Sequence, residues 1–266
     1  MSKIGFIGAG NMATAIIGGI IEAKVFAAGK IFVYDILQEK VADLHKQFGV
    51  KATDSVKELV ESVDTIVLSV KPQTFVDVLE GVKDHVNKDQ TIISIAAGIT
   101  TERIAKFLPN NTIIRVMPNT PALVGEGAAA LYSGNASIIA MDSAVQIFEA
   151  VGIAVVVETE GLIDAVTAVS GSGPAYYFKL MEAMVTAGVK LGLDAETAKQ
   201  LVLQTAKGAA ILACNSEDEP AELRKKVTSP GGTTAAALKA FEDGNIDGLV
   251  ETALTAARDR SVELSG

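Results

Sequence analysis

The stretch KIGFIGAGNMA at residues 3–13 decides the fold class of this chain. It begins as an apolar, isoleucine-rich run that is typical of a buried strand, and it continues directly into a segment whose apolar residues recur at helical spacing. The turn between them has the pattern G-x-G-x-x-A. Gly8 allows the tight turn, Gly10 allows close approach of a pyrophosphate, and Ala13 keeps the helix close to the strand. Because a helix N-terminus also attracts phosphate, this stretch predicts a dinucleotide site at the start of an α/β sheet.

Further apolar runs alternate with helical stretches in the first half of the chain. Strands are predicted at residues 30–35, 63–70, 90–96 and 112–116, and helices at residues 11–24, 38–48, 75–82 and 101–108. Strands that are apolar along their whole length are buried on both faces. The pattern therefore predicts a doubly wound parallel sheet, covered by helices on each side.

From about residue 162 the alternation stops, and the sequence predicts only helices. They are expected at residues 162–169, 173–190, 195–213, 221–226, 233–242 and 246–263. Several are rich in alanine and apolar nearly all round, whereas an exposed helix keeps one polar face. We therefore expect a dinucleotide-binding domain at residues 1–160 and a helical domain at residues 161–266. The helical domain is expected to pack against a second subunit, with a self-sufficient bundle core as the alternative.

The composition argues against several classes of protein. The 266 residues carry a net charge of −9, whereas a protein that binds a nucleic-acid backbone needs a basic patch. A single cysteine, Cys214, and two histidines outside metal-binding spacing, His45 and His85, argue against a disulfide framework and a metal centre. The chain shows no secretory signal and no apolar run of membrane-spanning length, so we expect a cytoplasmic protein without a membrane partner.

Asp35 ends the second predicted strand. An acidic residue at this position can accept hydrogen bonds from the adenosine ribose and repel a 2′-phosphate, which favours NADH over NADPH. The alternative is that Asp35 caps the helix that follows.

Three loops follow the carboxyl ends of later strands, where ligands of open α/β sheets bind. They are SVKP at residues 69–72, AAG at residues 96–98 and MPNTP at residues 117–121. The small residues of AAG would let a nicotinamide ring lie against the backbone, and Asn119 would orient its carboxamide or a neighbouring loop. We expect the three loops to line one groove; for each of them, a purely structural role as a turn or strand end is the alternative.

Two Gly- and Ser-rich stretches precede helices in the second half. SGSGPAY at residues 170–176 and TSPGGTT at residues 228–234 both place turn glycines just before a helix. Such N-termini present free N–H groups to an anion, and two of them facing one groove would suit a small carboxylate-bearing substrate. A well-capped helix start is the alternative for each.

Together these motifs resemble those of the Δ1-pyrroline-5-carboxylate reductase family over nearly the whole chain. FIGAGNM, VKP, AAG, MPNTP, SGSGPAY and SPGGTT are all present, and the last two are highly specific in combination. The resemblance implies a Rossmann-type domain followed by a helical domain that interleaves with its mate in a homodimer, often within a decamer. It also implies reduction of 1-pyrroline-5-carboxylate to proline by NADPH or NADH, the last step of proline biosynthesis.

The same resemblance implies which residues form the site. The expected dinucleotide contacts are Ile7, Gly8, Ala9, Gly10, Asn11, Met12, Asp35, Ser69, Val70, Lys71, Pro72, Ile95, Ala96 and Ala97, to which the loop argument adds Asn119. The expected substrate contacts are Ser229, Gly231, Gly232, Thr233 and Thr234, with Glu160 and Lys226 near the pocket. Thr234 is expected to be the catalytic hydroxyl that bonds the imine nitrogen. Val56 stands where members often carry an asparagine near the ribose, so the choice of cofactor stays open.

Two other functions fit part of the sequence. A β-hydroxyacid dehydrogenase shares the two-domain layout and would use Lys179, which has no obvious charge partner, but Glu182 stands where its asparagine is expected. A non-catalytic dinucleotide-binding protein would keep the glycine turn but would not need Thr234. An assay with pyrroline-5-carboxylate and each reduced cofactor separates the three functions.

Overall fold

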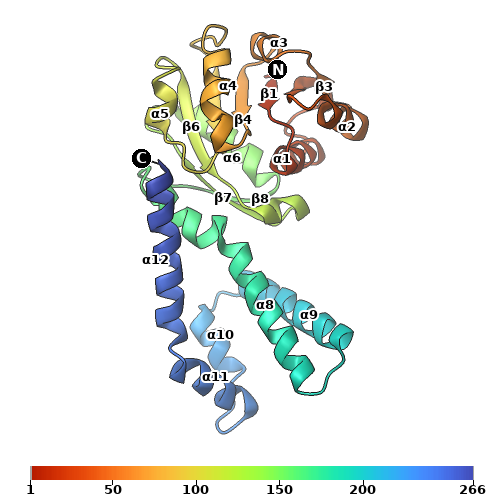
Figure 1. Cartoon of the computed structure of the whole chain (residues 1–266), viewed down its shortest axis with the longest axis vertical. Helices are drawn as coiled ribbons and strands as arrows, with labels where there is room; N and C mark the ends of the chain where they lie inside the picture. Colours follow the sequence, from red (N-terminus) through yellow and green to blue (C-terminus); the bar gives the residue numbers. More distant parts are fainter. Residues whose placement is uncertain (1, 266) are drawn as a thin grey trace. The chain divides into compact units, whose positions relative to one another are not determined.

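The computed structural model describes residues 2–265, and an eight-stranded sheet forms the centre of their α/β part (Figure 1). Its strands lie in the order β3-β2-β1-β4-β5-β6-β7-β8. Their bounds are β1 (Ile4–Ile7), β2 (Ile31–Tyr34), β3 (Lys51–Ala52), β4 (Thr65–Leu68), β5 (Thr91–Ser94), β6 (Thr112–Met117), β7 (Gly127–Tyr132) and β8 (Gly152–Val156). The strands from β3 to β6 are parallel, as predicted, whereas β7 runs antiparallel to β6 and β8 runs parallel to β7. The doubly wound fold is confirmed, with two reversed strands added at one edge.

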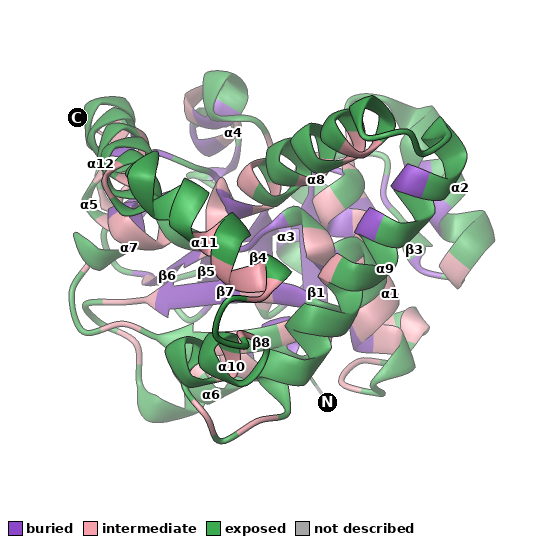
Figure 2. Ribbon diagram, turned by 90° about the horizontal axis from the view of Figure 1, so that it is seen from below, coloured by how far each residue is buried: buried purple, intermediate pink, exposed green. Residues whose placement is uncertain are grey.

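Helices cover both faces of this sheet, which is why its strands are apolar on both sides. One layer consists of α1 (Asn11–Glu22), α2 (Gln38–Phe48) and α6 (Ile138–Glu149). The other layer consists of α3 (Val56–Ser62), α4 (Phe75–Val82) and α5 (Thr101–Ala105). Neighbouring residues of β1 show the alternation, because Phe6 packs into the first core and Ile7 into the second. Figure 2 shows the buried strands between these layers.

The sequence patterns did not predict β3, α3, β7, α6 or β8. β3 has only two residues, and β7 reads GAAALY, in which glycine and alanine have low strand propensity. Three 3-10 turns complete the connections: η1 (Ala28–Lys30), η2 (Pro72–Thr74) and η3 (Thr120–Val124). The short β3 and the alanine-rich β7 depend on their neighbours for stability, so local patterns do not reveal them. The 12-residue α6 and the β-branched β8 did carry local signals, which the prediction missed.

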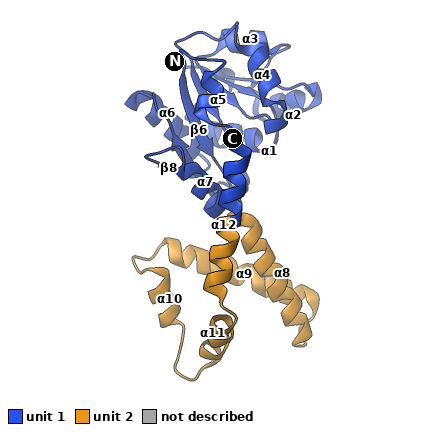
Figure 3. Cartoon of the chain, turned by 60° about the vertical axis from the view of Figure 1, so that its left-hand side comes forward, with its two compact units in different colours: residues 1–172, 256–266 blue, residues 173–255 orange. Residues whose placement is uncertain are grey.

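The chain divides into two compact units (Figure 3). Unit 1 comprises residues 1–172 and 256–266, and unit 2 comprises residues 173–255. Unit 1 holds the sheet, its helices, α7 (Leu162–Val166) and the π-helical turn η4 (Thr167–Gly171). The helix predicted at residues 162–169 thus ends at Val166 and continues as this π turn.

Unit 2 is entirely helical, as predicted. It contains α8 (Gly173–Lys190), α9 (Ala195–Cys214), α10 (Pro220–Lys226), α11 (Thr233–Asp243) and the first part of α12 (Ile246–Ser265). Within residues 173–255 only Gly173, Ala198 and Val202 are buried, whereas large apolar side chains such as Tyr177 and Leu249 are 67% exposed. Figure 2 shows these helices mostly as exposed. Unit 2 therefore has no substantial core of its own, and an apolar surface of this extent indicates an interaction site.

Residues 2–265 contain neither a membrane-spanning helix nor a cluster of metal-ligating side chains. None of the helices there is both long and apolar enough to cross a membrane. The same residues hold no group of three or more His, Cys, Asp or Glu side chains placed to bind a metal.

Candidate active site

The two glycines of the turn between β1 and α1 have different structural roles. Gly8 has φ of +105°, and a Cβ atom there would lie 2.7 Å from the carbonyl oxygen of Ser69. Gly10 is the N-cap of α1 with φ of −81°, and a Cβ atom there would meet nothing within 4 Å. No side chain caps α1, so its first N–H groups are free for a ligand. The fold requires Gly8, whereas Gly10 leaves space beside an uncapped helix end, as a bound pyrophosphate requires.

Ser69 and Asp35 hold this turn in place. The Ser69 hydroxyl donates to the carbonyl oxygen of Gly8 at 2.6 Å, and the Gly8 N–H donates to that of Tyr34 at 2.8 Å. The Asp35 carboxylate accepts the N–H of Ala9 at 2.7 Å and that of Leu37 at 2.9 Å. The N-cap of α2 is Leu37, with no side-chain cap, so the alternative that Asp35 caps this helix is wrong. Asp35 instead connects the end of β2 to the glycine turn.

The three loops predicted to line a groove follow the carboxyl ends of parallel strands. Ser69, Val70, Lys71 and Pro72 follow β4, Ile95–Gly98 follows β5, and the loop with Asn119 follows β6. Because β1, β4, β5 and β6 are parallel and in register, these loops lie at the carboxyl ends of the strands, where the glycine turn also lies. Ser69 and Ile95 are half-buried, Ala96 is buried, and Ala97 and Lys71 are exposed. Asn11 is exposed and Met12 half-buried at the start of α1.

Asn119 binds two segments of unit 1. Its amide group donates to the carbonyl oxygen of Ser170 at 3.1 Å and accepts the N–H of Ala128 at 2.8 Å. The side chain is buried, with the residue 8% exposed. Asn119 therefore orients the neighbouring β7 and η4, which is one of its two expected roles. A contact with a carboxamide stays a prediction.

Glu160 is bound within unit 1 on both carboxylate oxygens. Oε1 accepts the N–H of Thr101 at 2.7 Å and Nη1 of Arg115 at 3.1 Å, and Oε2 accepts the Thr101 hydroxyl at 2.7 Å. Arg115 was not among the predicted residues, although an arginine inside the apolar strand TIIRV is a signal for a buried partner. A role for Glu160 toward the substrate stays a prediction.

The SPGGTT turn starts α11 in unit 2. Gly231 has φ of +70°, and the Gly232 N–H donates to the carbonyl oxygen of Ser229 at 3.0 Å. α11 begins at Thr233 with Gly232 as N-cap and has no side-chain cap. Thr233 is exposed and Thr234 half-buried. The first turn of α11 thus offers N–H groups and two hydroxyls in one place, as a carboxylate-bearing substrate would need.

The two lysines of unit 2 that the sequence singled out, Lys226 and Lys179, both form ion pairs at the surface. Lys226 pairs with Asp218, and its hydrogen bond lowers the pKa of the Asp218 carboxyl below the usual value. Lys179, the lysine that a dehydrogenase would use, pairs with Glu182 at 3.1 Å and is therefore not without a charge partner. A contact of Lys226 with the substrate stays a prediction.

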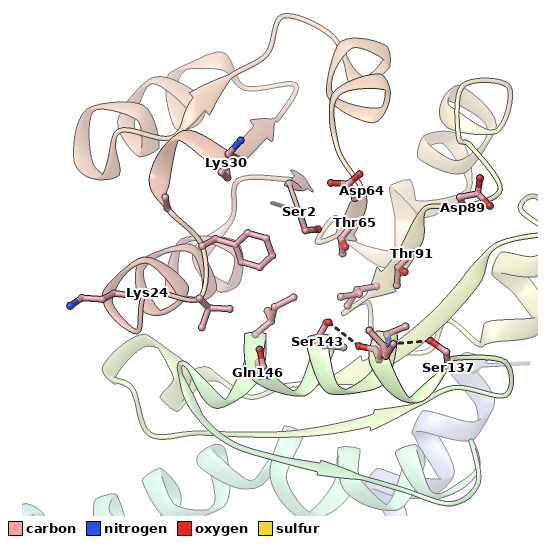
Figure 4. Close-up of a pocket in the computed structure, with 18 residues that line it drawn as sticks. Ser2, Lys24, Lys30, Asp64, Thr65, Asp89, Thr91, Ser137, Ser143 and Gln146 are labelled. Atoms are coloured by element: carbon pink, nitrogen blue, oxygen red, sulfur yellow. Dashed lines mark hydrogen bonds between the residues drawn. The ribbon is translucent and has the colours of Figure 1, made fainter.

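A pocket of about 580 Å³ lies away from the glycine turn (Figure 4). It is lined by Thr65 and Thr91, the first residues of β4 and β5, and by residues of α6. The candidate site lies beyond the carboxyl ends of these strands, whereas this pocket lies at their amino ends.

Models of two protein families match the chain. One, described as pyrroline-5-carboxylate reductase dimerisation, matches residues 160–264. The other, described as NADP oxidoreductase coenzyme F420-dependent, matches residues 3–98. The matched segments correspond to the helical part and to the start of the sheet.

Several proteins that match the chain over nearly its whole length are pyrroline-5-carboxylate reductases. The chain is 49% identical to a pyrroline-5-carboxylate reductase of Pseudomonas aeruginosa, over 99% of this chain and 97% of that protein. It is 40% identical to that of Escherichia coli, over 99% and 98% of the two chains. The solved pyrroline-5-carboxylate reductase of Coxiella burnetii matches with a TM-score of 0.94 and 41% identity, over 100% and 99% of the chains. A Plasmodium falciparum pyrroline carboxylate reductase, solved with NADP bound, matches with a TM-score of 0.88 and 33% identity, over 100% and 98%.

Proposed function

The chain belongs to the pyrroline-5-carboxylate reductase family, and from this premise we propose how its residues reduce 1-pyrroline-5-carboxylate to proline. It is an oxidoreductase with a Rossmann-type domain and a helical dimerisation domain. The observation that carries the proposal is an identity of 49% over nearly the full length, with every motif of the site present. This reduction is the last step of proline biosynthesis.

The edge of the sheet beside α1 suits a nicotinamide dinucleotide. The residues from Ile7 to Met12 would hold the pyrophosphate, since Gly10 leaves space and α1 is uncapped. Asp35 would face the adenosine ribose, and the segments Ser69–Pro72 and Ile95–Ala97, with Asn119, would line the nicotinamide end. When bound in reduced form, the dinucleotide supplies the hydride that reduces the imine carbon.

We propose that the enzyme accepts both NADH and NADPH. The Asp35 carboxylate, at the end of β2, supports NADH because it would repel a 2′-phosphate. The matching NADP oxidoreductase model and the NADP bound to the Plasmodium falciparum relative support NADPH.

The SPGGTT turn would hold the substrate. We propose that the Gly231 N–H and the free N–H groups at the start of α11 bind its carboxylate, supported by Ser229, Gly232 and Thr233, and that the Thr234 hydroxyl bonds the ring nitrogen. The Gly232 N–H, which was also expected to bind the carboxylate, instead donates to the Ser229 carbonyl oxygen. A hydroxyl is a poor acid at neutral pH, so Thr234 orients the ring, while water or prior protonation provides the proton. Orientation is the main requirement, because reacting atoms must be held about 3–3.5 Å apart. We propose that Lys226 and Glu160 lie near the bound substrate.

The helical domain supports a homodimer. The dimerisation model covers residues 160–264, and unit 2 exposes large apolar side chains. We propose a division of roles in which residues 1–160 bind the dinucleotide and residues 161–266 bind substrate and form the dimer. A decamer built from dimers is part of the proposal, as is a cytoplasmic location, which the exposed free thiol of Cys214 supports because it suits a reducing compartment.

The test is an assay of the purified protein and its Thr234→Ala variant with pyrroline-5-carboxylate and either NADH or NADPH. We expect the wild type to oxidise both cofactors, and Thr234→Ala to lose about 100- to 1,000-fold in kcat with unchanged dinucleotide affinity. Thr252→Ala, which removes an exposed threonine hydroxyl elsewhere in unit 2, should keep full activity. A wild type that binds dinucleotide but does not reduce pyrroline-5-carboxylate would overturn the proposed function.

A further inference from the structure

Arg115 is a buried residue at the centre of a polar cluster, and the proposed reaction gives Arg115 itself no role. Its side chain is 3% exposed, with Nη1 3.1 Å from Oε1 of Glu160 and Nη2 3.8 Å from Oδ1 of Asp164. The Ser261 hydroxyl donates to the same Asp164 oxygen at 2.7 Å, and Glu160 also binds Thr101. We refer to these five residues as the Arg115 cluster.

The Arg115 cluster joins four elements of unit 1 that are far apart in the sequence. Arg115 is on β6, Thr101 is the first residue of α5, Asp164 is on α7, and Ser261 is on the last part of α12. Thr101 follows directly after the loop of residues 95–100, which is proposed to line the nicotinamide end of the site. The cluster therefore links the end of the chain to one end of this loop.

The same loop meets α12 at a second point. Gly98 has φ of +71°, and a Cβ atom there would lie 3.1 Å from both Cβ and the carbonyl oxygen of Leu264. The last turn of α12 thus lies directly against the loop, and a side chain in place of Gly98 would require Leu264 to shift. Glu160 holds Thr101, and Leu264 limits Gly98, so the loop is held at two places three residues apart.

The Arg115 cluster is not explained by its contribution to the free energy of unfolding alone. Charged groups lose hydration when they are buried, and a buried ion pair often contributes no more than well-packed apolar side chains would. In return, its hydrogen bonds have strict geometry, so they can specify the position of a segment. In this case the positioned segments are the start of α5, the end of α12 and the loop between their contact points.

We propose that Ser261, Asp164, Arg115 and Glu160 are positioning residues for the reduction, which use the end of α12 to fix the loop of residues 95–100 under the nicotinamide ring. This inference rests on the proposed function. None of the four side chains needs to touch substrate or cofactor for the effect. A loop that moves by a fraction of an ångström changes the distance from hydride donor to imine carbon, and so lowers kcat.

The experiment uses two mild variants of the full-length protein. Ser261→Ala removes the hydroxyl that binds Asp164, and Thr101→Val removes the hydroxyl that binds Glu160, while Arg115 keeps both carboxylates in each case. Because no charge is left unpaired, both variants should fold. We expect each to lower kcat about 10-fold and to weaken dinucleotide binding, with an unchanged KM for pyrroline-5-carboxylate and an unchanged oligomeric state. Ser261→Thr, which keeps the hydroxyl, should restore most of kcat.

Ser143→Ala serves as the matched control, since this exposed serine on α6 also donates one hydrogen bond, to Ile139 at 2.8 Å. It should leave kcat and dinucleotide binding unchanged. If Ser261→Ala and Thr101→Val lower only the thermal midpoint and leave kcat and the dinucleotide Kd as in the wild type, the cluster is merely structural and the inference is overturned. If the wild type does not reduce pyrroline-5-carboxylate, the proposed function fails, whereas the dinucleotide Kd of the two variants still tests the positioning role.

Discussion

Gly8 and Gly10 stand two residues apart, yet the structure assigns them different consequences on substitution. Gly8→Ala forces a side chain into positive φ and places its Cβ atom 2.7 Å from the Ser69 carbonyl oxygen. We expect a loss of about 1–3 kcal/mol in the free energy of unfolding, measured by urea denaturation. Gly10→Ala meets no protein atom, so its free energy of unfolding should stay within about 0.5 kcal/mol of the wild type.

Dinucleotide binding separates the two positions further. Gly10→Ala should raise the Kd for NADPH at least about tenfold, because its methyl group occupies the space through which the pyrophosphate approaches. Gly29→Ala, in the exposed turn η1 with open space around it, is the control and should change neither stability nor binding. Wild-type affinity for NADPH in Gly10→Ala would show that the phosphates bind elsewhere.

Side-chain roles at the site were predicted unevenly from the sequence. The glycine turn was recognisable because its motif lies within one short segment and Gly8 has a positive φ, which is a local requirement. The bond from Asp35 to Ala9 and the buried Arg115 cluster depend on which segments the fold brings together. No local pattern carries that information, although an arginine within an apolar strand marks a position that needs a buried partner.

At the scale of elements, strong periodicity decided what the sequence could predict. The apolar strands β1, β2, β4, β5 and β6 were predicted, and so were helices α8 to α12, each to within a few residues. β7 was not predicted, because its alanines and glycine carry little strand preference. β8 reads GIAVV and does have strand preference, so the sequence offered a signal there that the prediction missed.

The N-cap of α9 gives a prediction about pH. Asp194 accepts the N–H of Thr197 at 2.9 Å, and hydrogen bonds from Thr197 lower the pKa of its carboxyl. Since the folded-state pKa is below the unfolded value of about 3.9, the carboxylate stabilises the protein above that pH. This stabilisation is lost as the pH falls through the folded-state pKa. Asp194→Ala should therefore have a lower thermal midpoint than the wild type at pH 7, and the difference should shrink below about pH 4.

Asp194→Asn tests the cause of this effect. An asparagine also caps a helix but does not titrate in this range, so its thermal midpoint should lie near that of the wild type at pH 7. A difference between wild type and Asp194→Ala that is the same at pH 7 and pH 3 would show that the charge of this cap does not contribute.

At the scale of the whole molecule, the distribution of buried and exposed apolar side chains indicates that stability depends on subunit association. Unit 1 has two well-buried cores, whereas residues 173–255 bury only three residues and expose Phe178, Leu212 and Leu249 by 57–67%. A single unit 2 therefore gains little from burial. Residues 160–264 match a family described as pyrroline-5-carboxylate reductase dimerisation, so we expect a second subunit to cover these side chains. Stability and subunit association are then one equilibrium, so the thermal midpoint should rise with protein concentration.

Leu249→Glu tests this coupling directly. On a monomer, a charge at a position that is 67% exposed would change stability by less than about 0.5 kcal/mol. In a dimer, this substitution places a carboxylate in an apolar interface. We therefore expect the dimer to dissociate to monomers, measured by sedimentation at micromolar concentration. The thermal midpoint should then no longer depend on protein concentration. Ile138→Glu makes the same chemical change at an 80% exposed position of unit 1 and should leave the sedimentation coefficient unchanged. Equal sedimentation of Leu249→Glu and the wild type would mean that the apolar face around Leu249 is not what the second subunit covers.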